Sequence, residues 1–401
     1  MKRYGAGGDS SPEREVLLWS ARIGQAPQED GDRILEFLAG GLDWPLLRQA
    51  AVDHGILPLL YTRLGEVGEH LVPPAERAQI KALYVANARR NLRMTARLLT
   101  ILKLLREKGI EAIPLKGPSL AEAAYGDVAL RQFVDLDILV AEEQILKARD
   151  LLVSLGFTPR YTLTKRQESV HMRRDIEYTF RSQKSMFILD VHWRLAPSYY
   201  RVDMHNLLER HALGSLAGFP IPSLAPDDLL LYLCFRGMRD MWDKLGLLCD
   251  VAALLRRNQD WDWGPLLEKA TSSGLRRTFL LGLALAHDIL RAELRPEIAE
   301  VLHRDRKLLR PRTEMATRFL TGPIGVESPG DWRVGLFPLR MMDSLSDKFR
   351  YCMDRLLLPT ARDWEVLRLP DYLFPLYYLL RPLRLASKWV RRPAPCDTGA
   401  R

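Results

Sequence analysis

Apolar residues recur every three or four positions over a long stretch of the chain, from about residue 76 to residue 108. This spacing predicts one long helix, and Gly109 is a residue type that commonly follows a helix C-terminus. Similar patterns between residues 30 and 70 predict short amphipathic helices. Pro73 and Pro74 separate these short helices from the long one, because proline cannot donate the amide hydrogen bond of a helix interior.

The pattern changes at Ile110, where short apolar runs replace the helical period. Such runs predict strands, and the last two read as a hairpin that turns near Gln183 and Lys184. The expected strands cover 110–115, 133–140, 176–182 and 185–195, and the expected helices between them cover 118–126 and 142–156. From Asp227 the helical pattern returns, at 227–238, 244–257 and 263–291.

These elements predict an α+β protein, in which a small mixed β-sheet lies between mainly α-helical N- and C-terminal regions. The first residues are rich in glycine, serine and charge, which favours a disordered leader. The expected division is a leader at 1–14, a helical region at 15–75, a sheet-containing core at 76–200, a helical domain at 201–310 and a C-terminal helical tail at 311–401.

Composition narrows the class of protein. The chain has 401 residues, of which 47% are hydrophobic and 27% charged, which is ordinary for a globular protein. A net charge of +9 is spread along the sequence and does not indicate a dedicated nucleic-acid surface. The four cysteines show no CxxC spacing, so neither a zinc site nor a redox pair is indicated. The start lacks the apolar core of a signal peptide, and no apolar run is long enough to cross a bilayer, so we expect a cytoplasmic protein.

The candidate chemistry lies on the predicted strands. Because side chains alternate between the two faces of a strand, Asp135 and Asp137 share one face of VDLDILV. Asp190 shares a face of FILDVHWRL with His192 and Arg194. If the strands are neighbours, three carboxylates converge, and their repulsion is costly unless a cation such as Mg²⁺ or Mn²⁺ lies between them. Two such ions can activate an attacking oxygen and stabilise a leaving pyrophosphate. We therefore expect that removing this charge does not lower stability.

A turn before these strands fits phosphate binding. Gly117 lets the backbone approach a phosphate closely, and Pro118 suits the first position of a helix. Ser119 adds a hydroxyl where free amide groups attract anions. Lys116 and Arg131 supply positive charge on either side. A glycine-serine turn, a helix and then a DxD strand is the order that a triphosphate site needs.

Each feature alone has a simpler interpretation. A lone DxD is more often a solvated strand edge, and a lone GPS sequence is more often only a turn. The combination with LDVHW favours a metal–nucleotide site. His192 is interpreted as a structural residue beside the ligands rather than as a metal ligand.

The segment LKGPSL…YGDVALRQFVDLDILV, followed by LDVHWRL, resembles the nucleotidyltransferase superfamily related to DNA polymerase beta, and within it an uncharacterised bacterial nucleotidyltransferase family. The resemblance runs from about Ala50 to Leu290 and includes DHGILPLLY, ARRN and DLLLYLCFRGMRDMWDKLGLLCDVAALL. It implies metal binding by three residues: Asp135, Asp137 and Asp190. It implies a triphosphate cradle at Gly117 and Ser119, with Lys116 and Arg131 at basic positions of the motif.

The chain departs from this pattern in two places. Pro118 stands between the glycine and the serine, where the superfamily usually has a direct Gly-Ser or Gly-Gly pair. Arg236 and Asp240 stand where such proteins often carry histidines, which puts the choice of acceptor in doubt. Asp250 is buried by pattern. A pairing with Arg236 or Arg239 and a role in acceptor binding are both open.

The resulting prediction is a metal-dependent nucleotidyltransferase that moves a nucleoside monophosphate from a nucleoside triphosphate to a small-molecule, peptide or protein acceptor. The alternative is a catalytically idle nucleotide-binding or interaction protein. Aromatic and basic residues at 371–392 suit peripheral membrane contact as well as packing on the protein, and packing is favoured.

Overall fold

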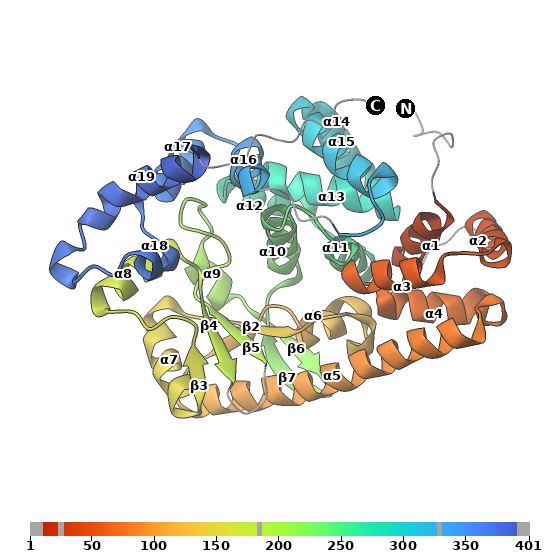
Figure 1. The fold of residues 1–401 in the computed structure, drawn as a ribbon, viewed down its shortest axis with the longest axis horizontal. Helices are drawn as coiled ribbons and strands as arrows, with labels where there is room; N and C mark the ends of the chain where they lie inside the picture. The colour runs from red at the N-terminus through yellow and green to blue at the C-terminus, as the bar shows by residue number, and fades with distance from the viewer. Residues whose placement is uncertain (1–10, 23–27, 183–186, 327–330, 391–401) are drawn as a thin grey trace.

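The long helix α5 (Pro74–Glu107) forms one side of the molecule, and the remaining elements are built upon it (Figure 1). The computed structural model describes residues 11–22, 28–182, 187–326 and 331–390. Pro73 and Pro74 begin α5, and Gly109 follows it with φ +68°. The prediction of this helix is confirmed. The N-terminal helices that pack near its first half are α1 (Pro12–Ala21), α2 (Gln28–Gly40), α3 (Trp44–Asp53) and α4 (Leu57–Val67).

A five-stranded mixed sheet forms the centre of the chain, in the order β1-β2-β5-β4-β3. Its strands are β1 (Ala112–Pro114), β2 (Asp135–Val140), β3 (Phe157–Pro159), β4 (Glu177–Ser182) and β5 (Ile188–His192). The β2–β5 pair is parallel, and the other pairs are antiparallel. The predicted hairpin is β4–β5, although its turn lies outside the described residues. The predicted α+β class with a small mixed sheet is confirmed.

The two faces of the sheet have different surroundings. Leu136, Ile138 and Val140 lie on one face and pack against apolar residues of α5 and of α7 (Ile145–Ser154). Alternation directs Asp135 and Asp137 to the opposite face, toward the helical region that follows. Figure 1 shows α10 and its neighbours on the side of the sheet opposite α5. The carboxylates therefore lie between the sheet and these helices.

Most of the chain after β3 folds into helices. They are α8 (Lys165–Arg174), α9 (Met204–Glu209), α10 (Pro226–Arg239), α11 (Leu245–Arg257), α12 (Trp263–Ser272), α13 (Arg276–Leu290), α14 (Pro296–Arg304), α15 (Arg306–Thr321), α16 (Asp331–Met341), α17 (Leu345–Leu357), α18 (Ala361–Val366) and α19 (Leu376–Val390). The segment expected as one helical stretch at 263–291 is two helices. No helix in the described part of the chain is long and apolar enough to cross a membrane.

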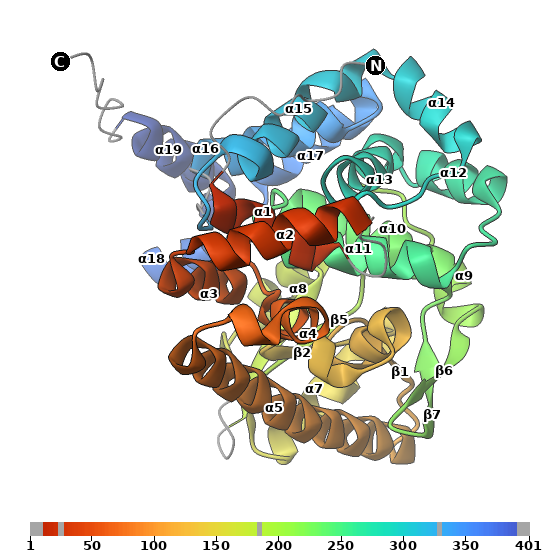
Figure 2. The same ribbon diagram turned by 90° about the vertical axis from the view of Figure 1, so that its right-hand side faces the viewer.

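Three features of the fold were not expected. The strand β3 and helix α8 lie in a stretch without a predicted element. A second sheet, β6 (Ala212–Leu216) with β7 (Phe219–Ser223), lies within 201–310, which was expected to be helical. Figure 2 shows this hairpin at the β1 edge of the main sheet. Residues 1–10 of the expected leader lie outside the described residues, and residues 12–14 belong to α1.

The described part of the C-terminal tail packs on the protein. Phe374 and Tyr377 are each 2% exposed, and they form a small apolar cluster with α8 and α18. Arg381 is also buried, and its Nη1 donates to Asp363 over 2.5 Å. This agrees with the favoured interpretation of the tail. Tyr372 is 78% exposed, and contact of this region with a membrane stays a prediction.

Candidate active site

Three carboxylates converge on the face of the sheet that looks toward α10. Asp137 of β2 lies directly opposite Asp190 of β5 in the parallel register, and Asp135 lies two residues before Asp137. One carboxylate oxygen from each residue lies within 4.8 Å of the other two. The predicted convergence of Asp135, Asp137 and Asp190 is therefore present in the fold.

Asp137 is the most enclosed member of this set, with a side chain 1% exposed. Its Oδ1 lies 2.6 Å from the Lys116 ammonium and 3.2 Å from Nε2 of His192. Burial alone would raise the pKa of Asp137, but Lys116 and His192 hold that pKa well below its usual range. The carboxylate is therefore ionised at neutral pH. Lys116, predicted to face a phosphate, is in this structure the counter-ion of Asp137.

Asp190 has the opposite electrostatic environment. Burial and the carboxylates of Glu177 and Asp137 raise the pKa of Asp190 to about 6, although Thr179 and His192 oppose this shift. Glu177 also lies 3.2 Å from Nε2 of His192. The sequence analysis did not single out Glu177. Its alternation with Ile176 and Tyr178 is the signal that could have placed it on the polar face.

The carboxylate set fits a divalent cation. Asp137 Oδ2 and Asp190 Oδ1 are buried, and within the described residues neither oxygen has a hydrogen-bond partner. Buried polar atoms are normally satisfied, so two orphaned oxygens on directly paired residues require an explanation. Carboxylate oxygens are the ligands that Mg²⁺ and Mn²⁺ prefer. A cation held by Asp135, Asp137 and Asp190 would give both oxygens a partner and offset the repulsion between the carboxylates.

The glycine turn lies between β1 and the start of β2. Gly117 has φ +63° and ψ −129°, a conformation that is open to glycine and strained for other residues. A Cβ there would also lie 3.4 Å from the backbone oxygen of Asp135. The Ser119 hydroxyl donates to the backbone oxygen of Lys116 over 3.1 Å, within the turn itself. A helical segment follows as predicted, α6 (Pro118–Leu120) running into a π-helical turn at Ala121–Tyr125.

Arg131 is engaged by a residue far away in the sequence. Its Nε and Nη2 donate to the two oxygens of Asp250 over 2.8 and 2.9 Å, and both side chains are largely buried. Of the two alternatives left open for Asp250, the pairing with Arg236 or Arg239 is wrong, because those two arginines lie beside Asp240 instead. Tyr125 adds a hydrogen bond to Asp250 over 2.8 Å.

The backbone around Arg131 is held by two asparagines of α5. The Nδ2 atoms of Asn87 and Asn91 each donate to the backbone oxygen of Arg131, over 3.2 and 2.8 Å. They also bond to the backbone oxygens of Ala129 and Val128. These asparagines therefore fix the segment that leads from the glycine turn into β2. The Nη1 atom of Arg131 is buried and lacks a hydrogen-bond partner within the described residues.

Replacing Asp250 by asparagine should destabilise the protein by about 3 kcal/mol, because a buried guanidinium would lose its carboxylate. Urea unfolding measures this change. Asp288→Asn is the matched control, since Asp288 forms a similar two-oxygen pair with Arg312 in a more exposed place. It should cost less than about 1 kcal/mol. Equal losses in the two variants would contradict a structural role for the Arg131–Asp250 pair.

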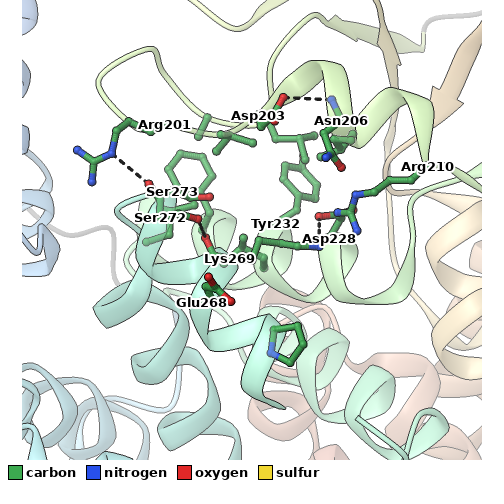
Figure 3. A pocket seen from close by; sticks show the side chains of 18 residues that line it. Arg201, Asp203, Asn206, Arg210, Asp228, Tyr232, Glu268, Lys269, Ser272 and Ser273 are labelled. Atoms are coloured by element: carbon green, nitrogen blue, oxygen red, sulfur yellow. Dashed lines mark hydrogen bonds and ion pairs between the residues drawn. The ribbon is translucent and has the colours of Figure 1, made fainter. Parts of the chain in front are cut away.

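Two cavities lie along α10, the helix that the carboxylate face of the sheet looks toward. The larger, of about 970 Å³, has Glu177 and Thr179 of β4 on one wall and residues of α17, α18 and α19 on another. The smaller, of about 400 Å³, lies among α9, α10 and α12 (Figure 3). Tyr232 and Asp228 line the smaller cavity, and Lys269 donates to Asp228 over 2.9 Å. Phe235 of α10 contributes to both cavities.

A mixed α+β sheet with carboxylates on neighbouring parallel strands and a glycine turn at its edge is the architecture of a nucleotidyltransferase. The family described as uncharacterised nucleotidyltransferase matches residues 40–291, more than half of the chain. The chain therefore belongs to that family, and the predicted class of enzyme is confirmed. This range also contains the span, from about Ala50 to Leu290, over which the sequence resembles the family.

No curated protein matches the chain. One solved structure with similarity is the solution structure of the antibiotic-resistance factor ANT(2'')-Ia. It is 14% identical, with a TM-score of 0.28, and the alignment covers 53% of this chain and 97% of that one.

Proposed function

We propose that the enzyme transfers a nucleoside monophosphate from a nucleoside triphosphate to an acceptor hydroxyl, with Mg²⁺ or Mn²⁺ held by Asp135, Asp137 and Asp190. The acceptor oxygen forms a bond to the α-phosphorus, and the bond from that phosphorus to the oxygen bridging to the β-phosphate breaks. Pyrophosphate leaves with the electron pair of the broken bond. The hydroxyl proton passes to Asp190 and then to solvent.

The observation that carries this proposal is the pair of buried, unpartnered oxygens on Asp137 and Asp190, directly opposite each other on parallel strands. A bound divalent cation would supply charge neutralisation at the phosphates and polarise the reacting oxygens. Lys116 and His192 orient Asp137 by contacting its Oδ1, which leaves Oδ2 directed elsewhere. Asp190 lies on β5 directly beside the Asp137 ligand position, so its carboxylate is placed to receive the proton of an acceptor hydroxyl that approaches from the β4 side.

The triphosphate would lie at the turn that contains Gly117 and Ser119. The Gly117 conformation supports this part of the proposal, because a side chain there would strain the backbone and approach Asp135. Lys116 and Arg131 flank the turn, and the unpartnered Nη1 of Arg131 is a donor for a phosphate oxygen.

The proposal is tested by incubating the enzyme with each labelled nucleoside triphosphate, Mg²⁺ and a metabolite extract. We expect label in a new product and stoichiometric pyrophosphate, both lost on addition of a chelator. Nucleotide binding without product formation in any extract would favour the idle binding protein instead.

Two substitutions in the turn distinguish the contribution of its backbone conformation to triphosphate binding from that of the Ser119 hydroxyl. Gly117→Val should weaken binding of a non-hydrolysable triphosphate analogue by about a hundredfold or more, because the turn must leave its present conformation. Ser119→Ala should weaken it by about tenfold or less, the loss of one hydrogen bond. Calorimetry with Mg²⁺ measures both affinities, and circular dichroism checks the fold. Equal affinity in Gly117→Val and the unmodified enzyme would move the phosphate site away from this turn.

A further inference from the structure

We propose that the 970 Å³ cavity beside β4 is the acceptor site, and that the acceptor is a small molecule carrying a phosphate or carboxylate group as well as its attacking hydroxyl. This inference rests on the proposed function, whose reaction it leaves unchanged. It adds where the acceptor lies and which chemical class it belongs to.

The position of the cavity follows from the order of the strands. The glycine turn lies at the β1 end of the sheet, the first two aspartates lie on β2, and Asp190 lies on β5. Beyond β5 comes β4, where Thr179 pairs with Asp190 and Glu177 pairs with His192. Thr179 and Glu177 line the cavity. The cavity therefore lies on the β4 side of Asp190, away from the triphosphate turn.

The charge of the cavity indicates what it binds. Seven arginines and three carboxylates are among its described lining residues. Nearby carboxylates neutralise the charge of some of these arginines: Arg174 lies beside Asp175, and Arg381 pairs with Asp363. Arg160, Arg355 and Arg362 also line the cavity, and none of them forms an ion pair with a described carboxylate. Guanidinium groups bind phosphate and carboxylate with two parallel hydrogen bonds, so an anionic ligand fits this wall.

Most of these arginines come from the C-terminal region, beyond the residues 40–291 that define the family. Arg355 belongs to α17 and Arg362 to α18. The part of the cavity wall formed by α18 is held in place by apolar packing, because Ala361 and Trp364 of α18 pack with Val170 of α8. Figure 1 shows α18 beside α8. Acceptor choice would therefore be set by a region outside the family core.

The smaller cavity is a poorer candidate for an anion. Its basic residues are already paired, Arg210 and Lys269 with Asp228 and Arg201 with Asp347. Figure 3 shows Arg210 directed at Asp228. No arginine without an ion pair lines its described walls. Both volumes, about 400 and about 970 Å³, lie within the 300–1,000 Å³ range typical of small-molecule sites, so charge rather than size distinguishes the two cavities.

The first test determines the charge of the acceptor by fractionating the extract before the transfer assay. A low-molecular-mass extract is divided by ion exchange into anionic, neutral and cationic fractions, and each is incubated with labelled triphosphate and Mg²⁺. We expect product from the anionic fraction. Product from the cationic or neutral fraction alone would overturn this inference while supporting the proposed function. Product from no fraction would overturn both.

A phosphatase step identifies the acidic group. The anionic fraction is treated with phosphatase, which is then removed before the assay. Loss of the acceptor activity indicates a phosphate, and its survival indicates a carboxylate. Both results support the inference.

The second test uses charge reversal in the cavity wall. Arg355→Glu with Arg362→Glu should raise the KM for the anionic fraction about tenfold or more, because charged hydrogen bonds are lost and repulsion is gained. Affinity for the non-hydrolysable triphosphate should stay unchanged. Arg368→Glu is the control, since this exposed arginine lies on the same stretch of chain but outside the cavity wall. An unchanged acceptor KM, or an equal loss of triphosphate affinity, would overturn the inference.

Discussion

Asp135→Asn is expected to lower nucleotidyl transfer by about a hundredfold or more while the protein stays folded. Asp135 stands at the start of β2, half-buried, with a carboxylate oxygen within 4.8 Å of those of Asp137 and Asp190. Asparagine keeps the size of the side chain and removes its negative charge. The measurements are the rate of label transfer with Mg²⁺ and the affinity for Mn²⁺ by calorimetry, which should also fall.

Asp135 is a cleaner choice than Asp137 because Asp137 has a second function. The Lys116 ammonium is 4% exposed and lies 2.6 Å from Asp137 Oδ1. Asp137→Asn would leave that ammonium buried without a carboxylate, at a cost of roughly 3–5 kcal/mol. The expectation that removing the clustered charge leaves stability unchanged therefore needs correction for Asp137. A loss of activity in that variant would not separate chemistry from folding.

Glu143→Gln provides the control for Asp135→Asn, because this exposed carboxylate lies just beyond the end of β2. It should retain full transfer. A folded Asp135→Asn enzyme with undiminished turnover would remove this residue from the metal site.

The carboxylate set could be predicted from the sequence because its information is local. The two-residue period of a strand places Leu136, Ile138 and Val140 in the core and leaves Asp135 and Asp137 on the other face. The same period in β5 places Asp190. The sequence alone does not show that β2 pairs with β5, and this pairing is seen only in the structure.

Interactions between distant segments were missed for a physical reason. Asp250 pairs with Arg131, which is 119 residues away, whereas the only ionic partners that the sequence suggested for it were two arginines on the preceding helix. The partner of Asp250 depends on how α11 packs against the segment after the glycine turn, and no local pattern specifies this packing.

The strand β7 was missed for a local reason, since it carries Pro220 and Pro222, which weaken the strand signal. The arginines of the large cavity also depend on tertiary packing, because β4, α17 and α18 are far apart in the sequence and yet line the same cavity.

Asp190→Ala is expected to remove chemistry far more than nucleotide binding. Asp190 lies on β5, one strand farther from the triphosphate turn than Asp135 and Asp137, and next to the strand that lines the proposed acceptor cavity. Triphosphate affinity should fall by less than about tenfold, or roughly 1.4 kcal/mol. The single-turnover rate with the acceptor fraction should fall by about a hundredfold or more, as is typical when a positioned base is lost.

Asp190→Asn distinguishes the loss of the negative charge from the loss of side-chain volume. Asparagine preserves the volume of the side chain and cannot accept the proton of the acceptor hydroxyl. We expect it to match Asp190→Ala in rate and the unmodified enzyme in triphosphate affinity. Because burial and the carboxylates of Glu177 and Asp137 act against the charge of Asp190, its removal should not lower stability in the absence of metal. An unchanged single-turnover rate would exclude Asp190 from the reaction. Equal losses in rate and affinity would instead place Asp190 at the nucleotide, and the acceptor would then approach from another side.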